Sequence, residues 1–299
     1  MKLIITSLEQ GLMFAILAMG VFLTYKVLNE SDLSVEGTFP FGAFIFAKFI
    51  SMGLDPIVST LFAFCLGTLA GLMTSILFIK LKIRPLLAGI LTMTMLYSVN
   101  LRINGKSNVP LFSYGSVFDL GSTLIILVIL VAAIKLILDT FLKTETGYLV
   151  IATGDNETLV KSLGANSNKY KIIAFMLANG LISLSGALMA QYQGFADATM
   201  GAGVIVVALA SIIIGDTIKK NSNWFKSTSR AIMGAVIYKI MGGIAIDLGL
   251  APTDLKAISA IIVIVFIAYN NFSVDLLGMK NRKERRATNV KNSKPIKDF

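Results

Sequence analysis

The chain has 299 residues, 55% of them hydrophobic and only 15% charged, and its mean hydropathy is +0.77. This composition excludes an ordinary soluble domain and indicates a membrane protein. The net charge of +10 does not predict nucleic-acid binding, because the basic residues fall in the connections between apolar stretches. The chain has no His and one Cys, Cys65, which excludes histidine catalysis, a disulfide framework and a thiolate metal site.

Apolar stretches follow one another along most of the chain. A helix needs roughly 20 residues to cross a hydrocarbon core about 30 Å thick, and lipid requires its backbone groups to be satisfied within the helix. The longer stretches are Leu12–Leu28, Phe41–Leu54, Ile57–Ile79, Leu120–Leu138, Ile172–Ala190, Val204–Ile218, Ala231–Ile246 and Ala257–Ala268. A shorter and more polar stretch is Leu86–Leu101. We predict an all-α polytopic bundle of about 8–10 membrane segments within one transmembrane domain, residues 1–279.

The basic residues predict the orientation of the bundle. They gather in residues 80–84, 143–171 and 219–230 and in a tail, residues 280–299. Two spans separate each cluster from the next, so all four fall on one side, which the positive-inside rule places in the cytoplasm. We therefore expect a multi-pass cell-membrane protein with a cytoplasmic C-terminus, whose basic tail contacts anionic lipid rather than nucleic acid. Nine passes would place the N-terminus outside, unless one segment is re-entrant.

Two segments are candidates for a broken or re-entrant helix. The first is the acidic run 29–37, and the second is Leu86–Leu101, which contains Thr92 and Asn100. Irregular backbone inside a membrane survives only where protein or a water-filled cavity covers it. An ordinary loop and a slightly polar span are the alternative. Gly67 and Gly71 form a G-x-x-x-G pair that predicts close helix packing, within the chain or between subunits.

The connection 143–171 contains a pattern typical of a short capped helix. Asp155 or Asn156 is placed to cap its first turn, Glu157 adds favourable charge there, and Gly164 is placed to end it. Leu159, Val160 and Leu163 are expected on one side of it. So short a helix needs a surface, either lipid headgroups or a cytoplasmic partner. The chain lacks a G-x-x-x-x-G-K-[ST] motif, so an ATPase driving it would be a separate protein.

At this point the residues resemble a known family. The chain is similar to the membrane-spanning permease subunits of ABC importers in the branched-chain amino acid and ribose permease superfamily, and more closely to the tryptophan/tyrosine (aromatic amino acid) permeases. The resemblance covers nearly the whole chain before the tail. Its motifs are Ala18–Tyr25, Asp32–Gly37, Leu91–Arg102, Ala152–Glu157 and Leu188–Asp197.

The resemblance implies a type II importer-like fold and a permease homodimer. It also implies two cytoplasmic subunits that bind the ATP, so that this chain needs no cofactor, and an extracellular substrate-binding protein. The solute would be an amino acid, aromatic in the closer group; a nucleoside or sugar is the alternative. The ATPase-coupling residues would be Gly154, Asp155, Asn156, Glu157, Leu159, Leu163 and Gly164.

Polar residues in or beside the spans are candidates for a substrate path or gate, because ionisable groups cost roughly 2.5–3.5 kcal/mol at the centre of an inserted helix. They are Asp32, Glu36, Asn100, Gln191, Gln193 and Asp197, each with a solvated loop or a structural role as the alternative. A rival function is an ion-coupled carrier that uses Asp32, Glu36 or Asp216; another is a membrane scaffold. No catalytic constellation is visible, so we do not expect an enzyme.

Overall fold

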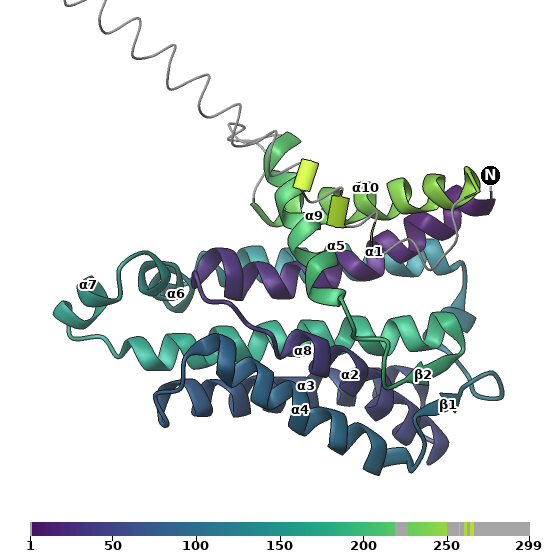
Figure 1. Cartoon of the computed structure of the whole chain (residues 1–299), viewed down its shortest axis with the longest axis horizontal. Coiled ribbons are helices and arrows are strands. Elements are labelled where there is room, and N and C mark those ends of the chain that lie inside the picture. The colour runs from purple at the N-terminus through teal and green to yellow at the C-terminus, as the bar shows by residue number, and fades with distance from the viewer. Residues whose placement is uncertain (1, 219–226, 250–256, 258–259, 262–263, 266–299) are drawn as a thin grey trace, which may run out of the picture.

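The computed structural model describes residues 2–218 and 227–249, together with 257, 260, 261, 264 and 265. Helices dominate these residues (Figure 1). In chain order the elements are α1 (Lys2–Phe22), the π-helix η1 (Leu23–Val27), α2 (Val35–Ser51), α3 (Pro56–Ile79), α4 (Pro85–Asn104), β1 (Asn108–Pro110), the 3-10 helix η2 (Val117–Leu120), α5 (Thr123–Phe141), α6 (Glu145–Asp155), α7 (Glu157–Ser162), α8 (Ser167–Gln193), β2 (Phe195–Asp197), α9 (Val204–Ile218) and α10 (Ser227–Asp247).

The prediction of an all-α polytopic bundle is confirmed. In the described part of the chain, six helical segments are long and apolar enough to cross a membrane: α1 with η1, α3, α4, α5, α8 and α10. The shorter helices α2 and α9 also lie in the bundle. The expected span Ala257–Ala268 lies mostly outside the described residues, and the boundary of the tail at residue 280 lies wholly outside them.

The two ends of the bundle differ. The turn between α3 and α4 and the helices α6 and α7 lie at one end, on the left in Figure 1, which we call the basic end. The strands β1 and β2 and the start of α1 lie at the opposite end. Lys171, near the start of α8, lies 4.9 Å from the centre of the Phe78 ring near the end of α3. The basic clusters 80–84 and 143–171 therefore share one end, as their spacing predicts.

Helix α8 forms the centre of the bundle, with α1, α2 and α3 packed around it and most of its residues buried. Glycines allow this approach: a Cβ on Gly67 would meet Ser183 of α8, and one on Gly71 would meet the Phe175 carbonyl. Gly186 of α8 faces the Phe39 carbonyl of α2 in the same way. The G-x-x-x-G pair thus packs α3 against α8 within one chain, which agrees with the first of its two interpretations.

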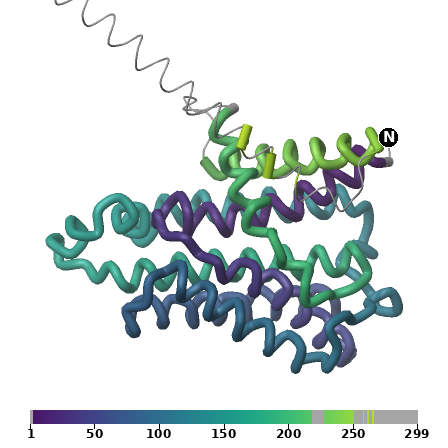
Figure 2. The backbone as a smooth tube through the Cα atoms, viewed as in Figure 1, coloured from purple at the N-terminus to yellow at the C-terminus, as the bar shows by residue number. Residues whose placement is uncertain are grey.

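The chain is broken between α1 and α2. After η1, residues 28–34 run back into the bundle without helical structure, and α2 begins at Val35 beside the middle of α8 (Figure 2). The break predicted in the acidic run 29–37 is therefore confirmed. A second interruption precedes α9, which begins at Val204 after a non-helical stretch from β2. Gly201 in that stretch lies against the Glu36 carbonyl in the first turn of α2.

Of the two interpretations of Leu86–Leu101, the slightly polar span agrees with the structure, because the stretch belongs to the full-length helix α4. That helix extends the apolar stretch at both ends, with Pro85 in its first turn and Gly105 ending it at a φ of 67°. The bundle also carries two short strands that were not expected: β1 and β2 form a small antiparallel ribbon in which Val109 is paired with Ala196. This pairing joins segments far apart in sequence, so no local pattern predicts it.

The glycine contacts between α3 and α8 give a stability prediction. Gly71→Ala places a methyl group against the Phe175 carbonyl and should lower the free energy of unfolding by about 1–3 kcal/mol. Gly242→Ala is the matched control, since a Cβ on this helical glycine meets nothing within 4 Å; it should be neutral, or stabilising by up to about 1 kcal/mol. Thermal unfolding in detergent micelles measures both. Equal melting temperatures for the two variants would contradict the packing.

Candidate coupling segment and translocation path

The segment after α5 folds into two short helices. Asn156 stands between them, and its side-chain oxygen accepts a hydrogen bond from the Leu159 amide at 3.0 Å, which caps α7. Of the two predicted caps, Asn156 is therefore the one used, and Asp155 is the last residue of α6. Gly164 has a φ of 76° and ends the helix, as predicted. The amides of Gly164 and Ala165 bond the Lys161 and Val160 carbonyls, which is a Schellman motif.

The two faces of α7 differ from the expectation. Val160 is fully buried, whereas Leu159 is 52% and Leu163 is 71% exposed. Leu159 and Leu163 are four residues apart and so share a face, while Val160 shares its face with Glu157, three residues before it. The prediction that all three apolar residues lie on one side is wrong, because Val160 is buried where α7 packs against α6 and α8. The outward face of α7 therefore carries two exposed apolar side chains, Leu159 and Leu163.

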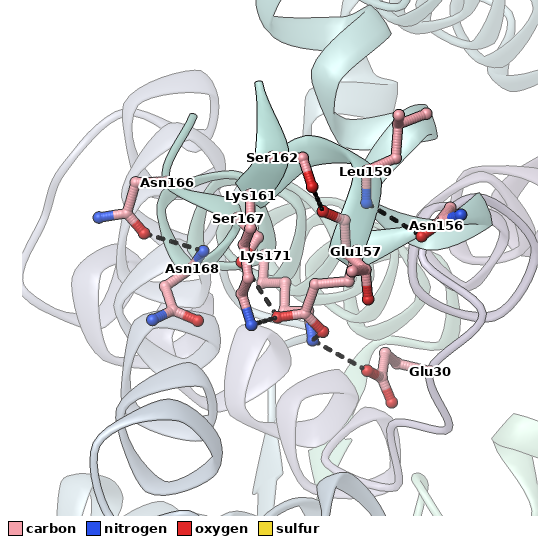
Figure 3. Close-up of polar contacts among 11 residues, drawn as sticks. Glu30, Asn156, Glu157, Leu159, Lys161, Ser162, Asn166, Ser167, Asn168 and Lys171 are labelled. Carbon is pink, nitrogen blue, oxygen red and sulfur yellow. Dashed lines mark hydrogen bonds and ion pairs between the residues drawn. The ribbon is translucent and has the colours of Figure 1, made fainter. Parts of the chain in front are cut away.

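Ion pairs attach α7 to the rest of the bundle (Figure 3). A Glu157 oxygen lies 2.8 Å from Nζ of Lys171 on α8, and the other lies 2.8 Å from Nζ of Lys161. Ser167, the first residue of α8, donates a hydrogen bond to Glu157 at 3.0 Å. Lys171 also lies 3.5 Å from an oxygen of Glu30, in the broken connection after α1. One lysine thus joins α7, α8 and the break between α1 and α2.

The surroundings of Glu157 change its acidity. Hydrogen bonds from Lys161, Lys171 and Ser167 lower its pKa from 4.5 to about 2. Burial raises the pKa of Glu30, although Lys171 opposes this shift. The ion pair of Glu157 is therefore fully formed at neutral pH.

Helix α6 holds the other side of the break. A Cβ on Gly154 would collide with the Val27 carbonyl in η1, so the backbones of α6 and η1 are in direct contact. Gly154 therefore has a structural role, because its lack of a side chain lets α6 approach η1 closely. Together α6 and α7 contact both η1 and the connection that follows it.

Asp32 lies inside the bundle and not in a solvated loop. It is 3% exposed, and its carboxylate accepts hydrogen bonds from the Ser34 amide at 2.9 Å, the Ser34 hydroxyl at 2.5 Å and the Asn179 amide at 3.0 Å. The Asn179 oxygen accepts a hydrogen bond from the Thr38 hydroxyl at 2.7 Å and lies 3.0 Å from the Ser34 hydroxyl oxygen. This network, Asp32–Ser34–Thr38–Asn179, fastens the start of α2 to the middle of α8. It also places a negative charge at the positive end of α2.

Glu36 and Asn100 meet at one cavity, although they come from α2 and α4. The cavity has a volume of about 300 Å³, and the connection that leads into α9 closes its third side. Glu36 accepts a hydrogen bond from the Gly203 amide, one residue before α9, at 3.0 Å. The N-termini of α2 and α9 therefore converge here, inside the bundle. Broken helices of this kind build binding sites in transporters.

The other three candidate path residues, Gln191, Gln193 and Asp197, lie at the end of the bundle opposite the basic end. Gln191 is buried, donates to Thr60 at 3.0 Å and accepts from the Val117 amide at 2.9 Å, so it fastens η2 to α3 and α8. Asp197 accepts from Asn108 across the ribbon at 3.1 Å and from Thr199. Gln193 is half-buried near the end of α8. None of these three lines the cavity of Glu36 and Asn100.

We did not single out three residues of these networks from the sequence, namely Asn179, Lys171 and Glu30. Asn179 is the one Asn or Gln inside the apolar stretch Ile172–Ala190, and an amide in a span is a signal that could have found it. Lys171 and Glu30 are visible only as members of a basic cluster and an acidic run. Asp216, a candidate ion site, is instead paired with Lys26 at 2.6 Å and lies 3.4 Å from Nε of Arg230.

The role of Lys171 can be tested by hydrogen exchange. Lys171→Met removes the ion pair with Glu157 of α7 and the ion pair with Glu30. The amides of Leu159–Leu163 should therefore exchange about tenfold faster, which corresponds to a local opening free energy lower by about 1.4 kcal/mol. Lys169→Met is the matched control, because Lys169 is exposed and lies two residues away on the same helix. Equal exchange in the two variants would show that Lys171 does not hold α7.

Acid should loosen α7. The folded-state pKa of Glu157 is depressed, so its stabilisation is complete above its ordinary value of 4.5 and is lost as the pH falls towards about 2. Protonation of Glu30, whose pKa is raised, favours the folded state and acts in the opposite direction. A spin label at Leu163→Cys in a Cys65→Ser background should become more mobile in this range. In the Glu157→Gln variant the label should be mobile already at neutral pH, and its mobility should not change with pH. If this variant kept the acid transition unchanged, Glu157 would not be the group that titrates.

The chain matches known proteins over most of its length. Residues 3–268 match the family model described as "Branched-chain amino acid transport system / permease component". The chain is 47% identical to a tyrosine transport system permease protein of Clostridioides difficile, over 91% of this chain and 93% of that protein. It is 34% identical to the uncharacterized protein RP368 of Rickettsia prowazekii, over 90% of this chain and 98% of that protein.

Two more distant matches are a ribose permease and a solved structure. The chain is 27% identical to the ribose import permease protein RbsC of Escherichia coli, over 70% of this chain and 68% of that protein. A solved structure of PsaBC from Streptococcus pneumoniae matches at 18% identity with a TM-score of 0.49, over 87% of this chain and 89% of that chain, a likeness too distant to add to the fold described above. The chain belongs to the branched-chain amino acid transport system permease family, whose relatives named here as permeases are transport proteins.

Proposed function

We propose that this chain is the permease subunit of an ATP-driven importer for an amino acid. A binding protein outside the cell delivers the solute, separate ATPase subunits bind the ATP, and two copies of the permease form the pathway. The observation that carries the proposal is the capped helix α7, with its apolar outward face and its ion-paired inward face. A helix of this length is not stable alone in water, so its firm attachment to α8 argues for a docking role.

The outward face of α7 is suited to a protein partner. Leu159 and Leu163 are exposed beside one another, and Tyr148 of α6 is exposed nearby in the chain. Lipid headgroups are the alternative surface, but neither helix presents the broad basic face that binds anionic lipid. The exposed charges of the two helices are mixed instead, with Glu145 and Asp155 on α6 and Lys161 on α7. An ATPase with an apolar groove is the occupant that fits best.

Motion of α7 has a direct route to the pathway. Glu157 pulls on Lys171, and Lys171 holds Glu30, which lies two residues before Asp32. Asp32 is fastened to α8 and to the start of α2, and the first turn of α2 carries Glu36 at the cavity. Movement at the basic end would therefore tilt α8 and the start of α2 together. Such rigid movement around a central site is how alternating access works.

The geometry supports this function over an ion-coupled carrier. Asp32 is surrounded by donors, namely the Ser34 amide, the Ser34 hydroxyl and the Asn179 amide, whereas a bound cation needs several oxygen ligands. Asp216 is engaged by Lys26 and Arg230. Asp32 and Asp216 therefore act as anchors, and Glu36 is the one candidate of the three that keeps an oxygen without a hydrogen bond or ion pair from the described residues. The positive-inside rule places the basic end, and the tail that follows the described residues, in the cytoplasm, where the ATPase and anionic lipid are found.

The solute is proposed from the relatives. The family description and the 47% identical relative name branched-chain amino acids and tyrosine, while ribose appears only at 27% identity. An amino acid therefore fits this chain better than a sugar.

Two alanine variants test the docking helix. Asn156→Ala removes the cap of α7, at a cost of about 1 kcal/mol, and should lower the ATPase stimulation that the permease confers on its co-expressed ATP-binding subunits. Lys169→Ala is the control and should leave stimulation unchanged, since Lys169 is exposed on α8 and lies outside the coupling residues. Leu163→Glu places a charge in the apolar face and should abolish assembly with the ATPase. Normal assembly of Leu163→Glu would contradict docking at α7.

A further inference from the structure

The cavity between α2, α4 and the connection into α9 has the dimensions of a site for one small solute. Its volume is about 300 Å³, at the lower limit of typical ligand pockets, which are mostly apolar with a few placed polar groups. Pro40, Met93 and Ala202 contribute apolar walls, and Tyr97 adds a half-exposed ring. Glu36 is the one carboxylate among the residues that line it.

Glu36 is held so that half of its carboxylate is left for a ligand. Its Oε1 accepts the hydrogen bond from the Gly203 amide at 3.0 Å, which fixes the side chain at the N-terminus of α9. Its Oε2 receives no hydrogen bond from any residue that the structure describes. The rest of the lining is mostly apolar, with Thr94, Asn100 and Thr199 as the other polar residues apart from Tyr97. An oriented carboxylate in such a cavity attracts a cation and would pair best with an ammonium group.

Asn100 supplies the second, independent observation. Its side chain is fully buried, and neither its Nδ2 nor its Oδ1 has a hydrogen-bond partner among the described residues. Buried amides are nearly always satisfied, so an unpartnered one beside a cavity indicates that a ligand or water completes it. Asn100 and Glu36 approach the cavity from different helices, which allows two-point contact with one solute.

We propose that this cavity is the solute subsite of the permease, and that it selects an amino acid with an apolar or aromatic side chain by its ammonium group. Glu36 Oε2 accepts the ammonium, Asn100 donates to the carboxylate, and Pro40, Met93 and Tyr97 contact the side chain. This inference rests on the proposed function. A pentose fits less well, because its hydroxyls need partners on all sides and the walls at Pro40, Met93 and Ala202 offer none.

Thiol protection tests the subsite in the full-length permease. Cys65 is the single cysteine, so Cys65→Ser gives a cysteine-free chain into which Ala202→Cys places one reporter at the cavity. Labelling by a small maleimide in nanodiscs should be slowed by L-tyrosine and by tyramine, which keep the ammonium. It should not be slowed by 3-(4-hydroxyphenyl)propionate, which lacks the ammonium, or by D-ribose.

Variants separate the subsite from the fold. Glu36→Gln keeps an oxygen for the Gly203 amide but loses the charge, so it should raise the tyramine concentration for half-protection about tenfold or more. Glu145→Gln, at an exposed site of the basic end, should leave protection unchanged, and Asn100→Leu should weaken L-tyrosine more than tyramine.

Three results would overturn the subsite: no labelling of Ala202→Cys, equal protection by the deaminated compound, or unchanged protection in Glu36→Gln. Because ATPase is absent from this assay, its outcome is independent of docking at α7. Loss of ATPase assembly with intact protection would count against the importer and not against the subsite.

Discussion

The buried carboxylate of Asp32 is the constraint on which the rest of this architecture depends. A charge inside a membrane bundle is tolerated only when donors and dipoles surround it, and here the Ser34 hydroxyl and amide, the Asn179 amide and the N-terminus of α2 do so. Because these donors come from α8 and from α2, the chain must break after η1 and return into the bundle. The break lets α2 begin beside the middle of α8, where its first turn can reach α4 and α9.

The same break links the two functional regions. At the basic end, Lys171 joins Glu157 of α7 to Glu30 in the connection after α1. Deeper in the bundle, Glu36 of α2 meets Asn100 of α4 at the cavity. Between them runs a short stretch that Asp32 anchors to α8. The proposed contact on α7 and the proposed solute at Glu36 would therefore act on one rigid unit, which is what a permease powered from outside its own chain requires.

Much of the fold follows from local patterns in the sequence. Apolar stretches of membrane length predict the spans, the G-x-x-x-G pair predicts close packing of its helix, and Asp155 or Asn156 together with Gly164 predicts both limits of α7. The sequence also indicates a break near Asp32, because acidic residues interrupt an apolar region. The contacts of Lys171, Glu30 and Asn179 could not be predicted, since each joins segments far apart in the chain. The sequence groups Val160 with Leu159 and Leu163 for the same reason. Its burial depends on the helices that pack against α7, which no local pattern reveals.

Distance measurement between spin labels tests whether α7 and the broken connection move together. Labels at Thr158→Cys and Ser31→Cys in a Cys65→Ser background report the separation of α7 from residues 28–34, since both positions are exposed and lie outside the apolar pair Leu159 and Leu163. With the ATPase subunits bound, addition of ATP should leave this distance distribution narrow and unchanged, while the distance from residue 158 to a label at Ile57→Cys, at the opposite end of α3, should shift. A distance between residues 158 and 31 that broadens or changes on its own would contradict this coupled movement.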